Sequence, residues 1–366
     1  MKISIKEICS FLDKAIPLSY QASYDNSGLQ IFSGDEETGS ALLAVDITEE
    51  VLEEAVSLGC GLIITHHPLI FFPVKTITGK SHTERIIINA IKNNISVYSA
   101  HTNLDSAPDG VSWKMAEKLA LLNVRVLAPM KNRLMKLVTW VPGSHIEKVR
   151  DAVFSAGAGV IGNYDRCSFN ASGYGTFRGN EETNPFAGEK GREHHEDEIR
   201  FETVLQSQMK SEVLKALLAS HPYEEPAYDF FMLENEFSGA GEGCVGELEN
   251  EMAELDFLLK LSEVFGAKGI RYSPLRNRSI KRVAMCGGAG SSYTGDAIRS
   301  GADVYITGDV KYHEFGNAAG DILLADIGHF ESEKYSTEII YDLIIKKFPT
   351  FALRFSERNT NPINYL

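Results

Sequence analysis

Short apolar runs alternate with amphipathic segments along the first 100 residues of the chain. The apolar spacing predicts a helix over residues 4–16, beginning at the capping residue Ser4 and ending before Pro17. Strands are then predicted over 41–46, 62–65 and 95–100, separated by helices over 49–58 and 83–92. This alternation is typical of an α/β layer with mostly parallel strands, in which ligands bind beyond the carboxyl ends of the strands.

The last third of the chain repeats this plan. Strands are predicted over 282–285, 303–307 and 322–326, with helices over 294–300 and from about 328 to 347. The segment 61–65 resembles the segment 302–307, so we interpret the two regions as an internal duplication. Two similar halves could face each other and pool the side chains at their strand ends.

The order of elements changes between these halves. Strands are predicted over 137–141, 159–164, 168–176, 199–205 and 227–233, with helices over 146–156 and 210–220. This order resembles a ferredoxin-like α+β domain inserted into a parent fold. We therefore expect a first half of an α/β core (1–130), an inserted domain (131–238) and a second half of the core (239–366). The polar stretch 179–198 is expected to be a mobile loop, which gives His194 and His195 no strand to hold them as metal ligands.

The composition narrows the class of partner. The chain carries 36 basic and 50 acidic residues, a net charge of −14, which argues against nucleic-acid binding because phosphate backbones are held by clustered Lys and Arg. A small anionic substrate stays open, since a bound metal can reverse the local sign of charge. Five cysteines without a C-x-x-C pair favour reduced thiols in a cytoplasmic protein. No apolar run reaches the roughly 20 residues of a membrane span, and Glu7 and Asp13 interrupt the region where a signal peptide would be apolar.

Candidate metal ligands follow three of the predicted strands. His66 and His67 end the strand 62–65, Asp105 follows the strand 95–100, and His329 and Glu333 follow the strand 322–326. Neighbouring side chains on an extended chain point to opposite faces, so His66 and His67 favour two adjacent ions over one, unless the pair is merely a polar strand end. Histidine nitrogen and carboxylate oxygen suit zinc best, with manganese or iron as alternatives.

These five groups can be divided between two ions. If Glu333 bridges both, His66 and His329 complete one set and His67 and Asp105 the other. Each ion then keeps an open position, as catalytic sites do. Two ions about 3.5–4 Å apart can lower the pKa of a shared water to roughly 7, and the pocket would attract a small anionic substrate.

Two further histidines lie near the same predicted edge. His101 and His313 are candidates for general acid or base catalysis, and the alternative is a packing or supporting role behind the metal ligands. The glycine-rich run 287–292 could hold a phosphate with its N–H groups, or it could be a turn that only needs glycine. The stretch 24–26, Tyr-Asp-Asn, could close the pocket, although a local Asx turn is the simpler interpretation.

Four motifs together resemble the Nif-three-like dinuclear-metal family, whose members are commonly labelled GTP cyclohydrolase 1 type 2 homologues. They are Thr-His-His-Pro at 65–68, His-Thr-Asn-Leu-Asp at 101–105, Thr-Gly-Asp at 307–309 with His313, and Gly-His-Phe-Glu-Ser-Glu at 328–333. In the middle, Gly-Asn-Tyr-Asp at 162–165 and His-Pro-Tyr-Glu-Glu-Pro at 221–226 resemble the extra domain of longer bacterial members, which is similar to nitrogen-regulatory (PII) and copper-tolerance (CutA) proteins. Tyr24 stands where Trp is expected and Phe330 where Tyr is common, which affects pocket shape only.

The resemblance carries expectations of its own. It implies an intertwined, duplicated, three-layer α/β core, a hexameric toroid and two divalent ions per subunit, with the same division of ligands as above. By the family label the reaction would be that of a GTP cyclohydrolase, in which water attacks C8 of the purine and formate leaves. The alternative is a regulatory or metal-handling assembly in which the inserted domain senses a ligand and the metal site is architectural.

Overall fold

The computed structural model describes residues 2–366 and divides them into two compact units. One unit comprises residues 2–129 together with 238–366, and the other comprises residues 130–237. Helices and sheets are mixed throughout, so the α/β class predicted from the sequence is confirmed.

The first sheet of the larger unit has the strand order β17-β4-β5-β6-β2. Its strands are β2 (Gly28–Ile31), β4 (Ser40–Ala44), β5 (Leu62–Thr65), β6 (Ser96–Ser99) and β17 (Ala352–Phe355). The strands β17, β4, β5 and β6 run parallel, and β2 is antiparallel to β6. Every residue of β5 and β6 is buried, which explains why these parallel strands are apolar or small along their whole length rather than alternating.

Three helices lie beside this sheet, and the first two differ in how their N-termini are capped. They are α1 (Ile5–Ala15), α2 (Glu49–Ser57) and α3 (His82–Lys92). Thr48 caps α2 by accepting a hydrogen bond from the Val51 N–H at 3.2 Å. Ser4 is the N-cap residue of α1, as predicted, but its side chain makes no capping hydrogen bond, and Ser4 also ends a short strand, β1 (Ile3–Ser4), paired with β3 (Glu37–Thr38).

The second sheet has the strand order β13-β16-β15-β14-β12-β7. Its strands are β7 (Leu122–Met130), β12 (Phe237–Ala253), β13 (Arg271–Tyr272), β14 (Ser279–Met285), β15 (Val304–Thr307) and β16 (Leu323–Asp326). The helices beside it are α5 (Val111–Lys118), α8 (Glu254–Phe265), α9 (Thr294–Arg299) and α10 (Tyr312–Ala318), and the 3-10 turn η3 (Ser291–Tyr293) precedes α9. The helix α12 (Ser336–Lys347) contacts α5 and the strands β4 and β17 of the first sheet, and the 3-10 turn η1 (Leu18–Tyr20) follows α1. Three strands of the second sheet, β14, β15 and β16, run parallel, compared with four in the first sheet.

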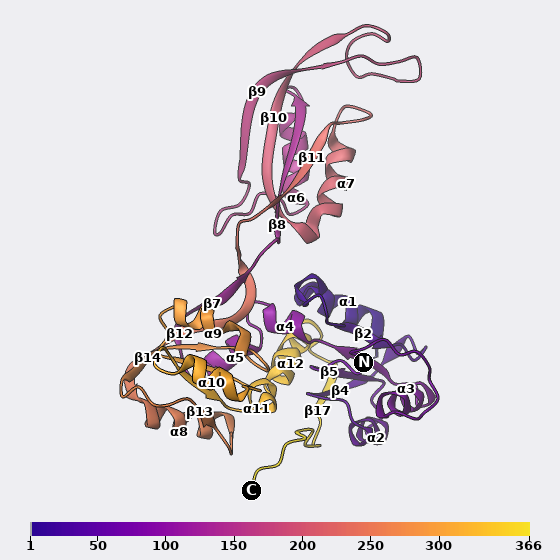
Figure 1. Ribbon diagram of the computed structural model, residues 1–366. Coiled ribbons are helices and arrows are strands. Elements are labelled where there is room, and N and C mark those ends of the chain that lie inside the picture. Colours follow the sequence, from indigo (N-terminus) through magenta and orange to yellow (C-terminus); the bar gives the residue numbers. More distant parts are fainter. Residues whose placement is uncertain (1) are drawn as a thin grey trace. The chain divides into compact units, whose positions relative to one another are not determined.

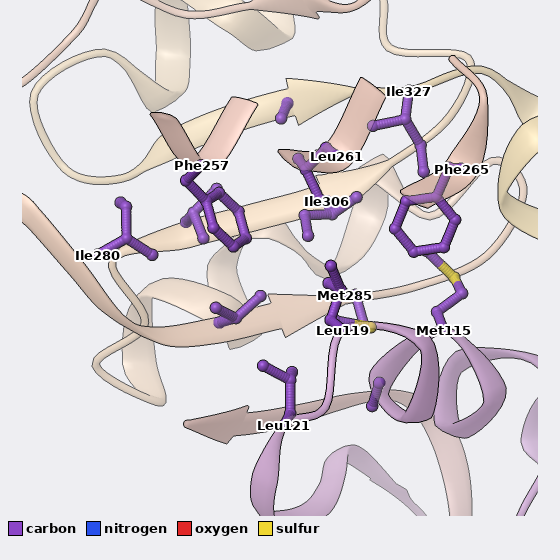
Figure 2. Close-up of a cluster of buried hydrophobic side chains, with 14 of the residues drawn as sticks. Met115, Leu119, Leu121, Phe257, Leu261, Phe265, Ile280, Met285, Ile306 and Ile327 are labelled. Atoms are coloured by element: carbon purple, nitrogen blue, oxygen red, sulfur yellow. The ribbon is translucent and has the colours of Figure 1, made fainter. Parts of the chain in front are cut away.

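A buried cluster joins α8 and α5 to the second sheet (Figure 2). The apolar residues Phe257, Leu261 and Phe265 lie four apart along α8, so they share the face that meets Ile306 and Met285 of the sheet. The helix α8 was not among the predicted elements, although this spacing was present in the sequence.

The two sheets exchange strands at their edges. The strand β17, close to the C-terminus, pairs with β4 of the first sheet, whereas β7, which precedes residue 131, lies in the second sheet. Each sheet is therefore completed by a segment from the other end of the chain (Figure 1).

The smaller unit is one antiparallel sheet in the order β11-β8-β10-β9. Its elements are β8 (Leu134–Pro142), α6 (Ile146–Ser155), β9 (Ser168–Phe177), β10 (His194–Gln206), η2 (Ser207–Met209), α7 (Lys210–Ser220) and β11 (Tyr228–Leu233). The apolar residues of α6 and α7 pack on one face of this sheet around Phe201 (Figure 1).

Two expectations for this unit are wrong. The strand predicted over 159–164 is absent from the described residues apart from one bridge between Ile161 and Tyr164. The strand β10 begins at His194, so His194 and His195 lie in a strand and not in a loop. The part of the β9–β10 hairpin that extends past α6 and α7 is exposed to solvent on both faces. Its residues therefore lack the alternation of apolar and polar positions by which a strand is recognised in a sequence.

Candidate metal centre

His66 and His67 follow directly on β5, at the carboxyl edge of the first parallel sheet. His66 has no exposed surface, and its Nδ1 lies 2.7 Å from the carbonyl oxygen of Ala100. A carbonyl can only accept, so Nδ1 carries the proton and Nε2 is left with a free lone pair. That Nε2 is buried and has no hydrogen-bond partner among the described residues.

Asp105 reaches the same place from α4 (Thr102–Ser106), the short helix that begins after β6. Its Oδ1 lies 3.6 Å from Nε2 of His66 and is also buried without a hydrogen-bond partner within residues 2–366. Burial, reinforced by the charge of Glu333, raises the pKa of Asp105 well above its ordinary value. An unpaired imidazole nitrogen facing an unpaired carboxylate oxygen is costly unless a cation joins them.

Glu333 and His329 come from the opposite half of the unit, on α11 (His329–Glu333). Oε2 of Glu333 lies 2.9 Å from Nε2 of His67, 3.0 Å from Nε2 of His329 and 3.6 Å from Nε2 of His66. The sequence predicted one continuous helix through residue 347, but α11 ends at Glu333 and α12 begins at Ser336. The four-residue spacing nevertheless brings His329 and Glu333 to a common face.

Two carboxylates orient His67 and His329 by contacting their Nδ1 atoms, while their Nε2 atoms face Glu333. Nδ1 of His67 lies 2.6 Å from Oδ1 of Asp46, and Nδ1 of His329 lies 2.8 Å from Oδ2 of Asp309. Carboxylates in this position fix the tautomer of metal-binding histidines and raise their basicity. The sequence analysis gave Asp46 and Asp309 no role, although Asp46 ends the predicted strand 41–46 and Asp309 belongs to the motif Thr-Gly-Asp at 307–309.

The charges of the cluster hold His67 and His329 in their protonated forms. Burial opposes protonation of His67, but its hydrogen bonds to Asp46 and Glu333 outweigh burial and raise its pKa from 6.5 to about 10. Burial is likewise outweighed at His329, where Glu333 and Asp309 raise the pKa to about 9. The histidines in turn overcome the burial of Glu333 and lower its pKa. The carboxylates thus favour positive charge at this position. In the protein alone, the protons on His67 and His329 supply that charge.

The donor set fits divalent metal ions. One ligand atom each from His66, His67 and Glu333 lies within 4.8 Å of the others. Histidine nitrogen and carboxylate oxygen suit zinc and other first-row metals. The fit rests on the two unpartnered buried atoms, Nε2 of His66 and Oδ1 of Asp105, which a metal ion between them would satisfy.

The two histidines proposed for proton transfer differ in position. The ring of His101 is centred 5.4 Å from the rings of both His66 and His67, and its Nδ1 lies 2.7 Å from Oδ1 of Asp25. Asp25 also accepts hydrogen bonds from Thr102 and Ser27, so it orients His101 and is more than a local turn residue. His313 is exposed on α10 and, within residues 2–366, forms no hydrogen bond or ion pair with the cluster.

The glycine-rich run 287–292 leaves space for Glu333. A Cβ on Gly288 would lie 2.1 Å from Oε1 of Glu333, and the φ angle of Gly288 is +61°. The N–H of Gly288 donates to the Ser332 hydroxyl and that of Gly290 to the Thr307 hydroxyl. Because these N–H groups are already used, the structure favours the turn that needs glycine over a phosphate cradle.

Two remaining sequence predictions concern the cysteines and membrane spans. All five cysteines are free, so no disulfide is formed. Within residues 2–366, none of the helices combines the length and the apolar character needed to cross a bilayer.

Fold and site together define an α/β protein whose larger unit has two mixed sheets and a candidate centre for divalent metal ions. A family model described as Duf34/NIF3 (NGG1p interacting factor 3) matches residues 3–362. The chain therefore belongs to the Duf34/NIF3 family, which confirms the resemblance seen in the motifs.

Individual relatives agree over nearly the whole chain. A protein of Halalkalibacterium halodurans named GTP cyclohydrolase 1 type 2 homolog is 38% identical over 352 residues, covering 91% of this chain and 95% of that protein. A Bacillus subtilis protein of the same name is 35% identical over 370 residues, covering 99% of this chain and 98% of that protein. The crystal structure of a Bacillus cereus protein related to NIF3 matches with a TM-score of 0.83 at 36% identity, covering 100% of this chain and 99% of that chain.

Proposed function

We propose that this protein is a metal-dependent hydrolase that holds two divalent ions, zinc first among the candidates, and acts on a small anionic substrate such as a nucleotide. The observation that carries the proposal is the pair of unpartnered buried atoms on His66 and Asp105, beside a carboxylate of Glu333 shared by three histidines. A purely structural polar cluster would satisfy its buried atoms internally.

The distances support a particular division of the ligands. Nε2 of His66 and Oδ1 of Asp105 lie 3.6 Å apart, and these two residues would share one ion with Glu333. The Nε2 atoms of His67 and His329 lie 3.2 Å apart and would share the other ion with Glu333. This exchanges the partners of His66 and His67 relative to the division suggested from the sequence, because adjacent histidines on a turning chain face different neighbours.

The chain's own residues then have distinct roles. When bound, a pair of divalent ions lowers the pKa of water to roughly 7 and so supplies a nucleophile at neutral pH. His101 would transfer a proton at its Nε2, since Nδ1 donates to Asp25 and the ring lies beside His66 and His67. His313 would have to reach the substrate from the exposed start of α10.

Three further expectations belong to this proposal. The strand order β11-β8-β10-β9 with α6 and α7 on one face supports a ferredoxin-like inserted domain. The free cysteines support a cytoplasmic location. The hexamer implied by the family resemblance remains a prediction, which sedimentation of the purified 40.4 kDa chain would check.

The first test measures metal content and formate release from GTP. We expect about two ions per chain, about one in Asp105→Asn, and activity reduced at least about tenfold in His67→Ala. His82→Ala is the matched control, because His82 is exposed and pairs with Glu49 on the surface, away from the proposed ligands. Formate release that is indifferent to His67→Ala would remove the hydrolase proposal for GTP, and metal-free protein from metal-supplemented cells would remove the metal centre itself.

A regulatory assembly is the second candidate function. The observation in its favour is a preformed cavity in the smaller unit, remote in sequence from every metal-centre residue. In that case metal would be bound, whereas no hydrolytic turnover would be found across a panel of nucleotides and phosphoesters.

A further inference from the structure

The smaller unit contains a cavity of about 520 Å³. Its lining comes from β8, β9 and β10 and from two loops, residues 178–186 and 221–227. The volume lies within the range of about 300–1,000 Å³ that is typical of small-molecule sites. Five aromatic residues and the carboxylate of Glu198 are prominent in the lining; the aromatic residues are Trp140, Tyr174, Phe177, Phe186 and Tyr223.

Glu198 lies on the face of the sheet that α6 and α7 do not cover. Side chains alternate along β10, and Ile199 and Phe201 pack into the helix-covered core, so Glu198 points the other way. Its residue exposure is nevertheless only 8%, because the two loops close over it. The opposite residues on β9 are small: a Cβ on Gly175 would lie 2.3 Å from Oε2 of Glu198.

One oxygen of this carboxylate is partnered and the other is not. The hydroxyl of Tyr223 donates to Oε1 of Glu198 at 2.8 Å. Oε2 accepts no hydrogen bond from the residues that the structure describes, and Lys and Arg side chains form no ion pair with Glu198 there. Glu198 therefore has one carboxylate oxygen that is free to interact with the charge of a bound cation.

Aromatic rings line the cavity together with Glu198. The ring of Tyr223 is centred 5.9 Å from that of Phe177 and 6.0 Å from that of Phe186, and Trp140 completes the lining from β8. The faces of such rings carry negative electrostatic potential and attract cations. The two acidic residues Glu224 and Glu225 also line the cavity, against the single cation Arg178.

Hydrogen bonds within the protein hold the two loops in place. Nδ1 of His221 accepts the Tyr223 N–H at 3.1 Å, so Nε2 donates to the Trp140 carbonyl at 3.0 Å. Glu224 accepts the Asn184 N–H at 2.9 Å, which ties the two loops together. The sequence motif His-Pro-Tyr-Glu-Glu-Pro at 221–226 thus has a structural role as one wall of the cavity.

We propose that this cavity binds a small organic cation, a protonated or quaternary amine, whose charge lies against Glu198 and whose alkyl groups contact the aromatic rings. A metal ion suits the cavity poorly: no histidine or cysteine lines it, and its three carboxylates do not converge, since the one candidate metal cluster found within residues 2–366 is His66, His67 and Glu333. An anion would be repelled by the three carboxylates. A neutral apolar ligand would leave the carboxylate of Glu198 without a counter-charge.

The test uses the full-length protein with choline, methylammonium and guanidinium as probes and 3,3-dimethylbutanol as the uncharged isostere of choline. Binding is followed by calorimetry and by fluorescence in a Trp113→Phe background, in which Trp140 is the remaining tryptophan of the two in the chain. We expect saturable binding of at least one cation, with affinity at least about tenfold above that of the isostere, because cation–π contact and the carboxylate each favour the charge.

Matched variants separate the site from the fold. Glu198→Gln should weaken cation binding at least about tenfold, and Glu202→Gln should leave it unchanged, because Glu202 is four residues further along β10 and pairs with Lys136 and Arg200 outside the cavity. Thermal melting checks that both variants fold. If Glu198→Gln does not fold, Phe186→Ala replaces it, since the Phe186 side chain is half exposed and its loss should weaken binding without unfolding the unit.

Three binding results and one sedimentation result would overturn the proposal. The binding results are no saturable binding of any of the three cations, equal binding of dimethylbutanol and choline, and cation binding that survives both Glu198→Gln and Phe186→Ala. A change in sedimentation coefficient of Glu198→Gln would also overturn it, because Glu198 would then pair with a basic side chain of a second copy of the chain and not with a small amine.

Discussion

Asp25 carries a charge whose stabilising effect depends on its neighbours. Burial alone would raise the pKa of Asp25 above its usual 3.8, but hydrogen bonds from His101, Thr102 and Ser27 outweigh burial and hold the pKa well below that value. A carboxyl group with a lowered pKa stabilises the folded state above its unfolded pKa, and this contribution is lost as the pH falls through the folded value.

We therefore predict that Asp25→Asn lowers the free energy of unfolding of the metal-free protein by about 1–3 kcal/mol at pH 7. The gap between wild type and variant should narrow as the pH falls below 3.8, measured by urea unfolding across a pH series. Asp13→Asn is the control, because burial outweighs the hydrogen bond from Tyr98 and raises the pKa of Asp13, so its charge does not stabilise the fold. A gap for Asp25→Asn that is constant down to pH 3 would contradict this account.

At the scale of single residues, the sequence predicted those candidate metal ligands that follow the end of a strand. His66, His67 and Asp105 could be predicted because each follows a short apolar strand, and such ends gather at one edge of a parallel sheet. Their division between ions could not be predicted, because it depends on side-chain directions after the chain has left the strand. Asp46 was not found for the same reason: its role appears only once His67 is seen to turn back towards it.

At the scale of elements, the turn between β14 and α9 determines where Glu333 can lie. Gly288 has a φ angle of +61°, a conformation that costs an L-residue about 1–2 kcal/mol. A side chain there would also overlap Oε1 of Glu333, 2.1 Å from the position of an ideal Cβ. The glycine is thus needed for both the backbone conformation and the close approach of the carboxylate.

We predict that Gly288→Ala loses most of its bound metal while retaining its secondary structure, as measured by metal analysis and far-ultraviolet circular dichroism. Gly39→Ala is a suitable control, because Gly39 has an ordinary φ angle and nothing lies within 4 Å of its ideal Cβ. Full metal content in Gly288→Ala would show that Glu333 can move without loss of the site.

Elements with buried faces were predicted better than elements in solvent. The strand β5 and the helix α7 have the predicted bounds, since burial on one or both faces leaves a clear apolar pattern. The beginning of β10 was missed because exposed residues alternate with partly buried polar ones there. The break between α11 and α12 was missed because it lies at Lys334 and Tyr335, two residues that an unbroken helix would also accept.

At the scale of the whole molecule, the larger unit has all the parts of the proposed metal centre. The exchange of β17 and β7 between its sheets ties the two halves that supply His66 and Glu333. This exchange could not be predicted from residue patterns, because an edge strand has the same apolar pattern whichever sheet it joins. The buried cluster of the smaller unit consists of its own residues, around Phe201.

The chain leaves and re-enters the larger unit through neighbouring strands. The strands β7 and β12 are adjacent in the second sheet, and an ideal Cβ on Gly241 would lie 2.3 Å from the Ala128 carbonyl, while one on Gly246 would lie 3.0 Å from the Leu122 carbonyl. The contacts advance in opposite directions, so the two strands form an antiparallel pair. A short turn could close such a pair without the intervening residues.

We predict that a protein in which Asn-Gly joins Pro129 to Ser238 still folds and binds the same amount of metal as the full chain, because all five proposed ligands and both parallel sheets are retained. Metal analysis and thermal melting measure this, and the same deletion with Glu333→Gln should bind little metal. Choline binding should disappear from the shortened protein, since the aromatic cavity has been removed. Failure of the shortened chain to fold, where the full chain does, would mean that the smaller unit is required for the metal centre and is not a separately folded insertion.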